Sequence, residues 1–207
     1  MTHHPAIIFD LGKVLVDFDY RILIERLARR CGKTPRAVAQ LVDRSPLLAA
    51  YESGTIGTQE FFDQVKQASG FPGDLDEFAD IFGDIFIEIE PLSAMQRQLR
   101  AAGFPTFIFS NTNPLAVRWI TRRFPFYSHF DGYIYSFEHR AQKPDPKLYE
   151  VVETAAATQS GSDLIYIDDR EENIATGKAR GWRTVLQENP TKTRTLVGEM
   201  TRLNFVI

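Results

Sequence analysis

Six polar residues at four places in the chain carry side chains that could act together on a phosphoryl group. They are Asp10, Ser110 with Asn111, Lys143, and Asp168 with Asp169. Carboxylates grouped in space offer oxygen ligands to a hard cation, and Mg2+ is usually bound by one or two carboxylates together with phosphate oxygens and water. A serine hydroxyl, a backbone N–H and a lysine ammonium are donors suited to phosphoryl oxygens. A carboxylate can also be the nucleophile, by forming an aspartyl phosphate.

Asp10 ends the apolar run over residues 6–9, and this run predicts the strand that positions it. The run is β-branched or aromatic and has no polar alternation, which is typical of a central parallel strand covered on both faces. Open α/β sheets bind ligands at the carboxyl ends of their strands, where Asp10 would lie. An aspartate here could equally cap a turn or a helix, so this stretch leaves both interpretations open.

Further apolar runs predict strands over residues 106–109, 132–136, 164–167 and 184–186. Helical patterns separate these runs, and Thr34-Pro35, Asn113-Pro114 and Asp145-Pro146 each predict a helix start, with a capping side chain before a first-turn proline. Strand and helix in alternation predict an α/β fold, a parallel sheet with helices on both faces. Because parallel strands end at one edge, we expect the six polar residues to converge there.

Residues from about 17 to 90 read as helices throughout and supply no strand to the sheet. Leu23, Leu27 and Cys31 recur four residues apart, which predicts one amphipathic helix. Thr58 is expected to cap another helix. Asp74 is expected to open a further helix that runs through Ile85 and on to residue 86. An insertion directly after the first strand lies above the carboxyl edge of the sheet. We therefore expect it to cover Asp10.

Composition excludes several classes of function. The chain has 207 residues, 43% of them hydrophobic and 12% aromatic, enough for a sizeable core. A net charge of -3 gives no general attraction to nucleic acid or anionic lipid. We expect no membrane span and no secretory signal, and hence a cytoplasmic protein. The single cysteine, Cys31, excludes an internal disulfide and is expected to be a small core residue.

The six residues stand in four motifs. These are Ile8-Phe9-Asp10-Leu11-Gly12, Phe109-Ser110-Asn111, Gln142-Lys143-Pro144-Asp145-Pro146 and Tyr166-Ile167-Asp168-Asp169. Each is weak alone, but together, in this order and with a helical insertion after the first, they resemble the signatures of the haloacid dehalogenase-like hydrolase superfamily. The resemblance implies a Rossmann-like parallel sheet core over residues 1–16 and 91–207, and a small all-helical cap over residues 17–90.

By position, the resemblance implies that Asp10 is the nucleophile and a metal ligand. Ser110 and the backbone of Asn111 would bind the phosphoryl group, and Lys143 would neutralise Asp10 and the phosphate. In isolation, Lys143 would more often be an ordinary surface lysine, and Asp168 with Asp169 a pair that caps a helix. The four motifs together favour the catalytic roles.

The resemblance also implies an Mg2+ site made by Asp10, Gly12, Asp168 and Asp169. Asp169 would be a direct ligand and Asp168 its neighbour, while Gly12 would contribute its backbone carbonyl. The expected partner is a small phosphorylated metabolite, neither nucleic acid nor membrane, and no pattern in the sequence indicates the oligomeric state.

Gly12 departs from the superfamily pattern. Phosphatases and phosphomutases of the superfamily usually carry a second aspartate at this position as general acid and base, a contribution typically worth ~10² to 10⁴ in rate. A mutase needs this group in both half-reactions and is therefore not expected. Asp17, Asp19 or a cap residue could supply the proton instead.

Three functions remain open. The favoured one is an Mg2+-dependent phosphatase similar to the Asp-Leu-Gly subgroup that acts on sugar phosphates such as glucose 1-phosphate, because a less basic leaving group needs less protonation. A 2-haloacid dehalogenase would use the same aspartate without a metal. The Asp168-Asp169 pair favours a bound cation and therefore argues against a dehalogenase. A catalytically weakened binder of a phosphorylated metabolite or protein is supported only by Gly12.

Specificity is expected to come from the cap, where no recognition motif is evident. Arg44, Tyr51 and Glu52 are candidates near helix breaks, although exposed loop positions explain them equally well.

Overall fold

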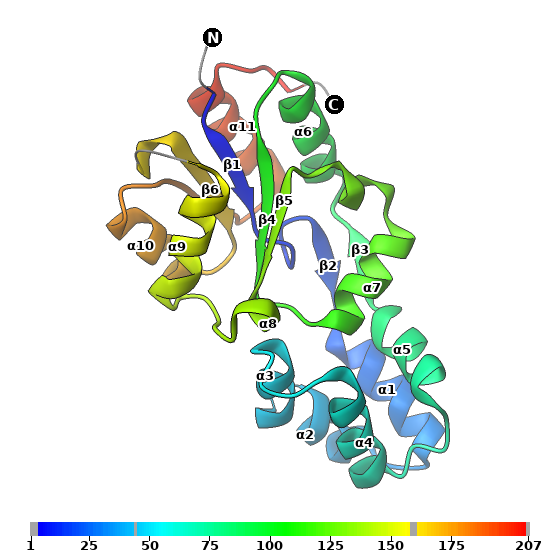
Figure 1. Cartoon of the computed structure of the whole chain (residues 1–207). Helices are drawn as coiled ribbons and strands as arrows, with labels where there is room; N and C mark the ends of the chain where they lie inside the picture. The colour runs from blue at the N-terminus through cyan, green and yellow to red at the C-terminus, as the bar shows by residue number, and fades with distance from the viewer. Residues whose placement is uncertain (1–3, 44, 158–160, 206–207) are drawn as a thin grey trace.

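The computed structural model describes residues 4–43, 45–157 and 161–205. Its main sheet contains the parallel strands β1 (Ala6–Phe9), β4 (Thr106–Ser110), β5 (Gly132–Tyr135), β6 (Leu164–Asp168) and β7 (Arg183–Leu186). Their order is β5-β4-β1-β6-β7, which places β1 at the centre between β4 and β6 (Figure 1). The predicted parallel α/β sheet is confirmed. β5 ends one residue earlier than predicted, because Ser136 begins the short helix α8 (Ser136–His139).

Both faces of the sheet are covered by helices, as the apolar strand sequences predict. On one face, Ile7 and Phe9 of β1 pack with α6 (Glu90–Ala101), α7 (Pro114–Arg123) and α11 (Pro190–Thr201). On the other face, Ala6 and Ile8 pack with α9 (Pro146–Ala155) and α10 (Glu171–Ala179). Successive side chains of a strand point to opposite faces, so this central strand serves two cores at once.

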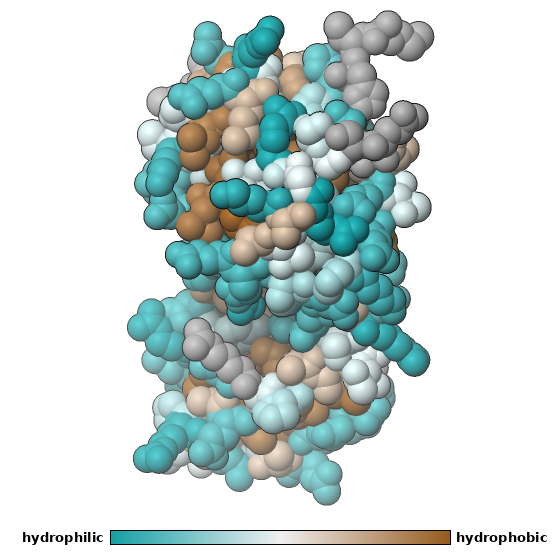
Figure 2. All heavy atoms as spheres, turned by 90° about the vertical axis from the view of Figure 1, so that its left-hand side faces the viewer, coloured by the Kyte–Doolittle hydropathy of each residue, from teal (hydrophilic) through white to brown (hydrophobic). Residues whose placement is uncertain are grey.

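Five helices form a second unit below the carboxyl edge of the sheet (Figure 1). They are α1 (Tyr20–Cys31), α2 (Pro35–Val42), α3 (Pro46–Glu52), α4 (Thr58–Ser69) and α5 (Leu75–Gly83). This helical unit has its own aromatic core, in which Tyr51 and Phe61 stack at 4.4 Å and Phe78 packs alongside. Cys31 packs partly buried at its edge, in agreement with the expected core role. Figure 2 shows a mainly hydrophilic outer surface, indented between the two units.

Two short strands connect the units, and here the prediction of helices throughout residues 17–90 is wrong. β2 (Val16–Phe18) and β3 (Phe86–Glu88) pair antiparallel, and the predicted continuation of α5 through Ile85 and Phe86 stops at Gly83. The chain passes between the units twice at this place, and pairing the two passages satisfies their backbone hydrogen-bonding groups. The Phe18 and Phe86 rings, with centroids 5.9 Å apart, add an apolar packing contact between the two strands.

The predicted helix starts are largely confirmed. The side chains of Thr34, Asn113 and Asp145 accept hydrogen bonds from the first turns of α2, α7 and α9. The prediction of Thr58 as a cap is wrong, because Gly57 occupies that position and Thr58 is already helical. The helix α11 was not predicted, although Asn189-Pro190 repeats the same cap-and-proline signal. None of the helices in the described part of the chain combines the length and apolar character needed to cross a membrane.

Candidate active site

The structure gathers the predicted site residues at the carboxyl edge of the sheet, as expected from parallel strand ends. Asp10 follows β1, Ser110 is the last residue of β4 and Asp168 is the last residue of β6. A cavity of about 880 Å³ lies between this edge and the helical unit. Its walls include Asp10, Gly12, Asn111, Lys143 and Asp169 from the sheet side, and Tyr20, Asp43, Ser45, Leu48, Ala49 and Glu52 from the helical side. Asp168 lies fully buried behind this wall.

Lys143 is the buried centre of the charge cluster. Its ammonium lies 3.0 Å from a carboxylate oxygen of Asp10 and 2.6 Å from one of Asp168, and it donates to the Phe109 carbonyl at 2.9 Å. Burial disfavours the charged ammonium, but the two carboxylates outweigh this and raise the pKa of Lys143. Lys143 is therefore a fixed cation beside the candidate nucleophile.

The three carboxylates suit a divalent cation. Asp10, Asp168 and Asp169 each offer one oxygen, and these oxygens lie within 4.8 Å of one another. Burial raises the pKa of Asp10 to about 7, an effect opposed by Lys143 and increased by the neighbouring negative charges of Asp168 and Asp169. One lysine thus leaves this cluster short of positive charge, which a bound cation would supply.

Asp168 is saturated with protein donors. One of its oxygens accepts from Lys143 and from the Tyr166 hydroxyl at 2.5 Å, and the other accepts from the Arg170 backbone at 2.9 Å and the Asn173 amide at 3.0 Å. Although burial opposes it, Lys143 holds the pKa of Asp168 below its ordinary value. Sequence reasoning missed Tyr166 and Asn173. The period of two within a strand places Tyr166 and Asp168 on one face and could have revealed that contact.

Asn111 holds the loop that carries Lys143. Its amide donates to the Lys143 carbonyl at 3.0 Å, and its side-chain oxygen accepts from the Lys143 backbone N–H at 2.7 Å. Sequence analysis assigned a role only to the Asn111 backbone. The structure adds a side-chain role, because this reciprocal pair fixes the lysine against the end of β4.

Phe18 fills the space beside Gly12. A Cβ atom at Gly12 would lie 2.8 Å from Cε1 of the Phe18 ring, which itself packs against Tyr20 at 5.5 Å and Phe86 at 5.9 Å. An acidic side chain at this position, which the resemblance would lead one to expect, therefore meets the Phe18 ring in this chain.

Gly12→Asp should destabilise the protein by about 1 to 3 kcal/mol, because the packed Phe18 ring must move. The same substitution should cost less in a Phe18→Ala background, where the ring is gone. Chemical denaturation of the four proteins in this double-mutant cycle measures the coupling. An equal cost in both backgrounds would show that the ring does not close this position.

Asp17 and Asp19, the predicted alternative proton sources, are engaged elsewhere. Asp17 is exposed and pairs with Lys13, whose hydrogen bond lowers the pKa of Asp17. Asp19 accepts from the Arg21 backbone N–H as the cap of α1 and pairs with the Arg21 side chain, which lowers its pKa to about 2. Neither carboxylate lines the cavity.

The three residues predicted as candidates for specificity lie in different places. Arg44 lies outside the described residues. Tyr51 belongs to the core of the helical unit, and its hydroxyl accepts from the Leu115 backbone N–H at 3.2 Å. Glu52 lines the cavity, where burial raises its pKa to about 7 and the charge of Arg170 opposes the shift.

Glu52→Gln should raise the melting temperature at pH 8 and raise it much less at pH 5. The pKa of Glu52 rises from 4.5 to about 7 on folding, so the folded state loses stability as pH rises through this range. Glutamine cannot ionise and avoids that loss of stability. Because the side chain is only half-buried, solvent screening makes the expected gain smaller than the pKa shift alone implies. Thermal unfolding at both pH values measures it, and a gain of equal size at pH 5 would exclude ionisation of Glu52 as the cause.

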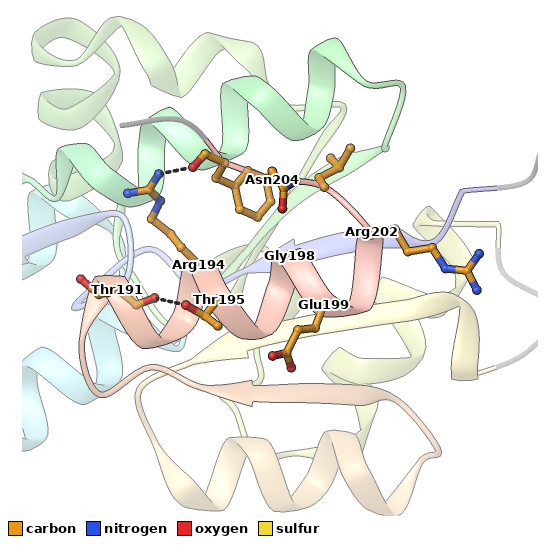
Figure 3. A pocket seen from close by; sticks show the side chains of 9 residues that line it. Thr191, Arg194, Thr195, Gly198, Glu199, Arg202 and Asn204 are labelled. Carbon is orange, nitrogen blue, oxygen red and sulfur yellow. Dashed lines mark hydrogen bonds between the residues drawn. The ribbon is translucent and has the colours of Figure 1, made fainter.

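A second hollow, of about 480 Å³, lies along α11 and the segment after it (Figure 3). Arg194 there donates to the Phe205 carbonyl at 3.1 Å, and Thr195 donates to the Thr191 carbonyl at 3.1 Å. None of the six predicted site residues lines this hollow.

Comparison with known proteins gives one matching family and several relatives. The sequence model of one family, described as haloacid dehalogenase-like hydrolase, matches residues 4–181. A D-ribitol-5-phosphate phosphatase of Bacteroides thetaiotaomicron is 21% identical over 189 residues, which is 88% of this chain and 91% of that protein. A sesquiterpene phosphatase of Aspergillus oryzae is 24% identical over 183 residues, 87% of this chain and 88% of that protein.

The fold is also found in solved structures. A crystal structure of a Bacteroides thetaiotaomicron enzyme of this family, in complex with magnesium and inorganic phosphate, superposes with a TM-score of 0.77 at 20% identity. The match covers 88% of this chain and 93% of that one. It shows that the two chains share their overall architecture.

Proposed function

The chain belongs to the haloacid dehalogenase-like hydrolases, and we propose that it hydrolyses phosphate monoesters of small metabolites through an aspartyl phosphate on Asp10, with Mg2+ bound. The observation that carries this proposal is the contact of Lys143 with Asp10 and Asp168 beside a third carboxylate, Asp169. This arrangement pairs a nucleophile with a fixed cation and with oxygen ligands for a metal. The two curated relatives, both phosphatases, support the same reaction class.

In the proposed reaction, a carboxylate oxygen of Asp10 attacks the phosphorus atom and the bond to the ester oxygen breaks. Lys143 favours the ionised form of Asp10, because its positive charge partly offsets the effect of burial on the pKa of Asp10. Ser110 and Asn111 line the hollow beside Gly12, and the Ser110 hydroxyl and the Asn111 backbone N–H would be the donors for the phosphoryl oxygens. Water then hydrolyses the aspartyl phosphate and restores the carboxylate.

The metal would be held by Asp10, Asp169 and the Gly12 carbonyl. When bound, Mg2+ supplies positive charge that stabilises the phosphoryl oxygens in the transition state. Asp168 already accepts hydrogen bonds from four protein donors. Its role is therefore to orient Lys143 and to contribute negative charge near the metal without binding it directly. This refines the assignment of Asp168 as a neighbour of the direct ligand Asp169.

The acidic cluster favours a phosphatase over a 2-haloacid dehalogenase. A dehalogenase would use Asp10 without a cation, yet the charges of Asp168 and Asp169 raise the pKa of Asp10 and so lower the fraction of Asp10 that is ionised and able to attack. A cation reverses that effect. The contacts of Lys143 also argue against a catalytically weakened protein that only binds its ligand. Such a protein would have no need of a nucleophile held beside a buried lysine.

For the substrate, we propose a hydroxylated leaving group such as a sugar or polyol. Tyr20, Asp43, Ser45 and Glu52 give the helical wall of the cavity hydroxyl and carboxylate partners for sugar hydroxyls, although Leu48 and Ala49 add an apolar patch. We propose that residues 17–90 act as the cap that carries this wall. The ribitol 5-phosphate of one relative fits this chemistry better than the sesquiterpene phosphate of the other.

A screen of phosphorylated metabolites with and without Mg2+ tests the proposal. We expect sugar and polyol phosphates to be the best substrates and EDTA to abolish their hydrolysis. Activity on 2-chloropropionate that survives EDTA would overturn the phosphatase assignment. A preference for prenyl phosphates would keep the reaction and overturn the substrate class.

A further inference from the structure

The proposed reaction needs a proton donor and acceptor that Gly12 does not provide. An alkyl phosphate leaves as a basic alkoxide unless the departing oxygen is protonated, and the water that attacks the aspartyl phosphate must lose a proton. Because Phe18 closes the space beside Gly12 and Asp17 and Asp19 are paired outside the cavity, the group must come from another element.

Four carboxylates of the described residues line the cavity, namely Asp10, Asp43, Glu52 and Asp169. Asp10 is the nucleophile and Asp169 is a metal ligand in the proposed reaction. Asp43 is exposed, at the end of α2, and lines only the large cavity. Glu52 also lines the smaller hollow formed with Gly12, Ser110 and Asn111, which places it in the same hollow as the position that lacks an acid.

The backbone at Glu52 is fixed to the sheet unit. The Ser136 hydroxyl donates to the Glu52 carbonyl at 2.6 Å, and the Leu115 N–H donates to the hydroxyl of the preceding residue, Tyr51. Two residues later, Gly54 lies against the Phe137 carbonyl so closely that a Cβ would come within 2.0 Å of that oxygen. These contacts hold the end of α3 over the edge of the sheet, so Glu52 is positioned relative to Asp10 although it belongs to the helical unit.

The charges around Glu52 suit a carboxyl group that exchanges a proton. Glu52 and Asp43 both act on the hydroxyl of Tyr20, whose pKa is raised mainly by burial and further by these two carboxylates. Arg170 faces Glu52 from the loop after β6 and opposes the effect of burial on the pKa of Glu52. Lys13 is engaged by Asp17 and the Phe18 carbonyl, and Lys143 by Asp10 and Asp168.

We infer that Glu52 is the acid–base residue of this enzyme, an assignment that rests on the proposed phosphatase function. As Asp10 forms its bond to phosphorus, the ester P–O bond breaks and the departing oxygen takes the Glu52 carboxyl proton. The resulting carboxylate removes a proton from water as the water oxygen bonds to phosphorus. The bond between phosphorus and Asp10 breaks, which returns its electron pair to Asp10 and leaves Glu52 protonated again.

Rapid-mixing kinetics of Glu52→Gln with p-nitrophenyl phosphate test this assignment. The p-nitrophenolate group leaves without protonation, so phosphorylation of Asp10 should keep its wild-type rate, while hydrolysis of the aspartyl phosphate should slow by ~10² to 10⁴-fold. The expected signature is a fast release of one equivalent of p-nitrophenolate per enzyme, followed by slow turnover. With D-ribitol 5-phosphate, a primary alkyl ester, phosphorylation itself should slow by a similar factor, so the fraction of phospho-enzyme should stay close to that of the wild type instead of rising.

The controls separate the possible failures. Glu60→Gln changes an exposed carboxylate of α4 and should behave as wild type, while Glu52→Asp should turn over at a rate between those of wild type and Glu52→Gln. If Glu52→Gln raised KM without a burst, or turned over p-nitrophenyl phosphate at the wild-type rate, the acid–base role would be wrong. If Asp10→Asn retained turnover, the phosphatase mechanism itself would be wrong.

Discussion

Asp10→Asn should abolish Mg2+-dependent hydrolysis of p-nitrophenyl phosphate, by at least ~10⁴-fold in kcat, because no phospho-enzyme can form on an amide. The other carboxylates near the site cannot replace Asp10. Asp168 is saturated by four donors, and Asp169 is needed for the cation in the proposed site. Steady-state kinetics with saturating Mg2+ measure the loss.

The substitution should leave the fold intact. Asparagine has nearly the shape of aspartate, and it removes a buried charge that burial already disfavours, since the pKa of Asp10 is raised to about 7. The melting temperature at pH 8 in EDTA should therefore not fall. Asp80→Asn, on the exposed face of α5, is the matched control and should retain full activity. Residual turnover in Asp10→Asn within tenfold of the control would exclude Asp10 as the nucleophile.

The parts of this site that follow from strand ends could be predicted from the sequence. Asp10, Ser110 and Asp168 end apolar runs that predict buried strands, and parallel strands present their ends at one edge. Lys143 lies in a loop, but its motif and the loop's place after β5 predicted its arrival at the same edge. The contact of Lys143 with both Asp10 and Asp168 needed the structure, because loop length alone does not fix a side chain.

The features that the sequence did not predict depend on contacts between distant segments. The strands β2 and β3, in which Phe18 lies opposite Phe86, pair because the chain crosses between the units twice, and local periodicity in the sequence does not reveal that crossing. Glu52 was only one polar residue near a helix end, until Ser136, 84 positions away, was seen to hold its carbonyl. The closure of Gly12 by Phe18 likewise depends on the path of the chain through β2.

Lys143→Met should destabilise the protein by about 3 to 5 kcal/mol at pH 8 and abolish turnover. The ammonium of Lys143 is buried between Asp10 and Asp168, and removing one partner of a buried ion pair leaves uncompensated charge. Chemical denaturation in EDTA measures the stability without a contribution from bound metal. Lys178→Met, on the exposed surface of α10, controls for the substitution itself and should be nearly neutral.

The pH dependence of this loss distinguishes lost charge pairing from lost packing. Without Lys143, burial should raise the pKa of Asp168 in the folded state above its unfolded value, and a carboxyl group with a raised folded pKa costs stability as pH rises. The deficit of Lys143→Met should therefore be smaller at pH 5 than at pH 8. Adding Asp168→Asn should recover part of the stability at pH 8, because it removes one of the two unpaired charges. The rings of Phe109 and Tyr166 lie 4.9 and 5.8 Å from the Lys143 ammonium. A stability deficit that is equal at both pH values, and is not reduced by Asp168→Asn, would mean that the aliphatic stem of Lys143 stabilises the fold by packing against these rings.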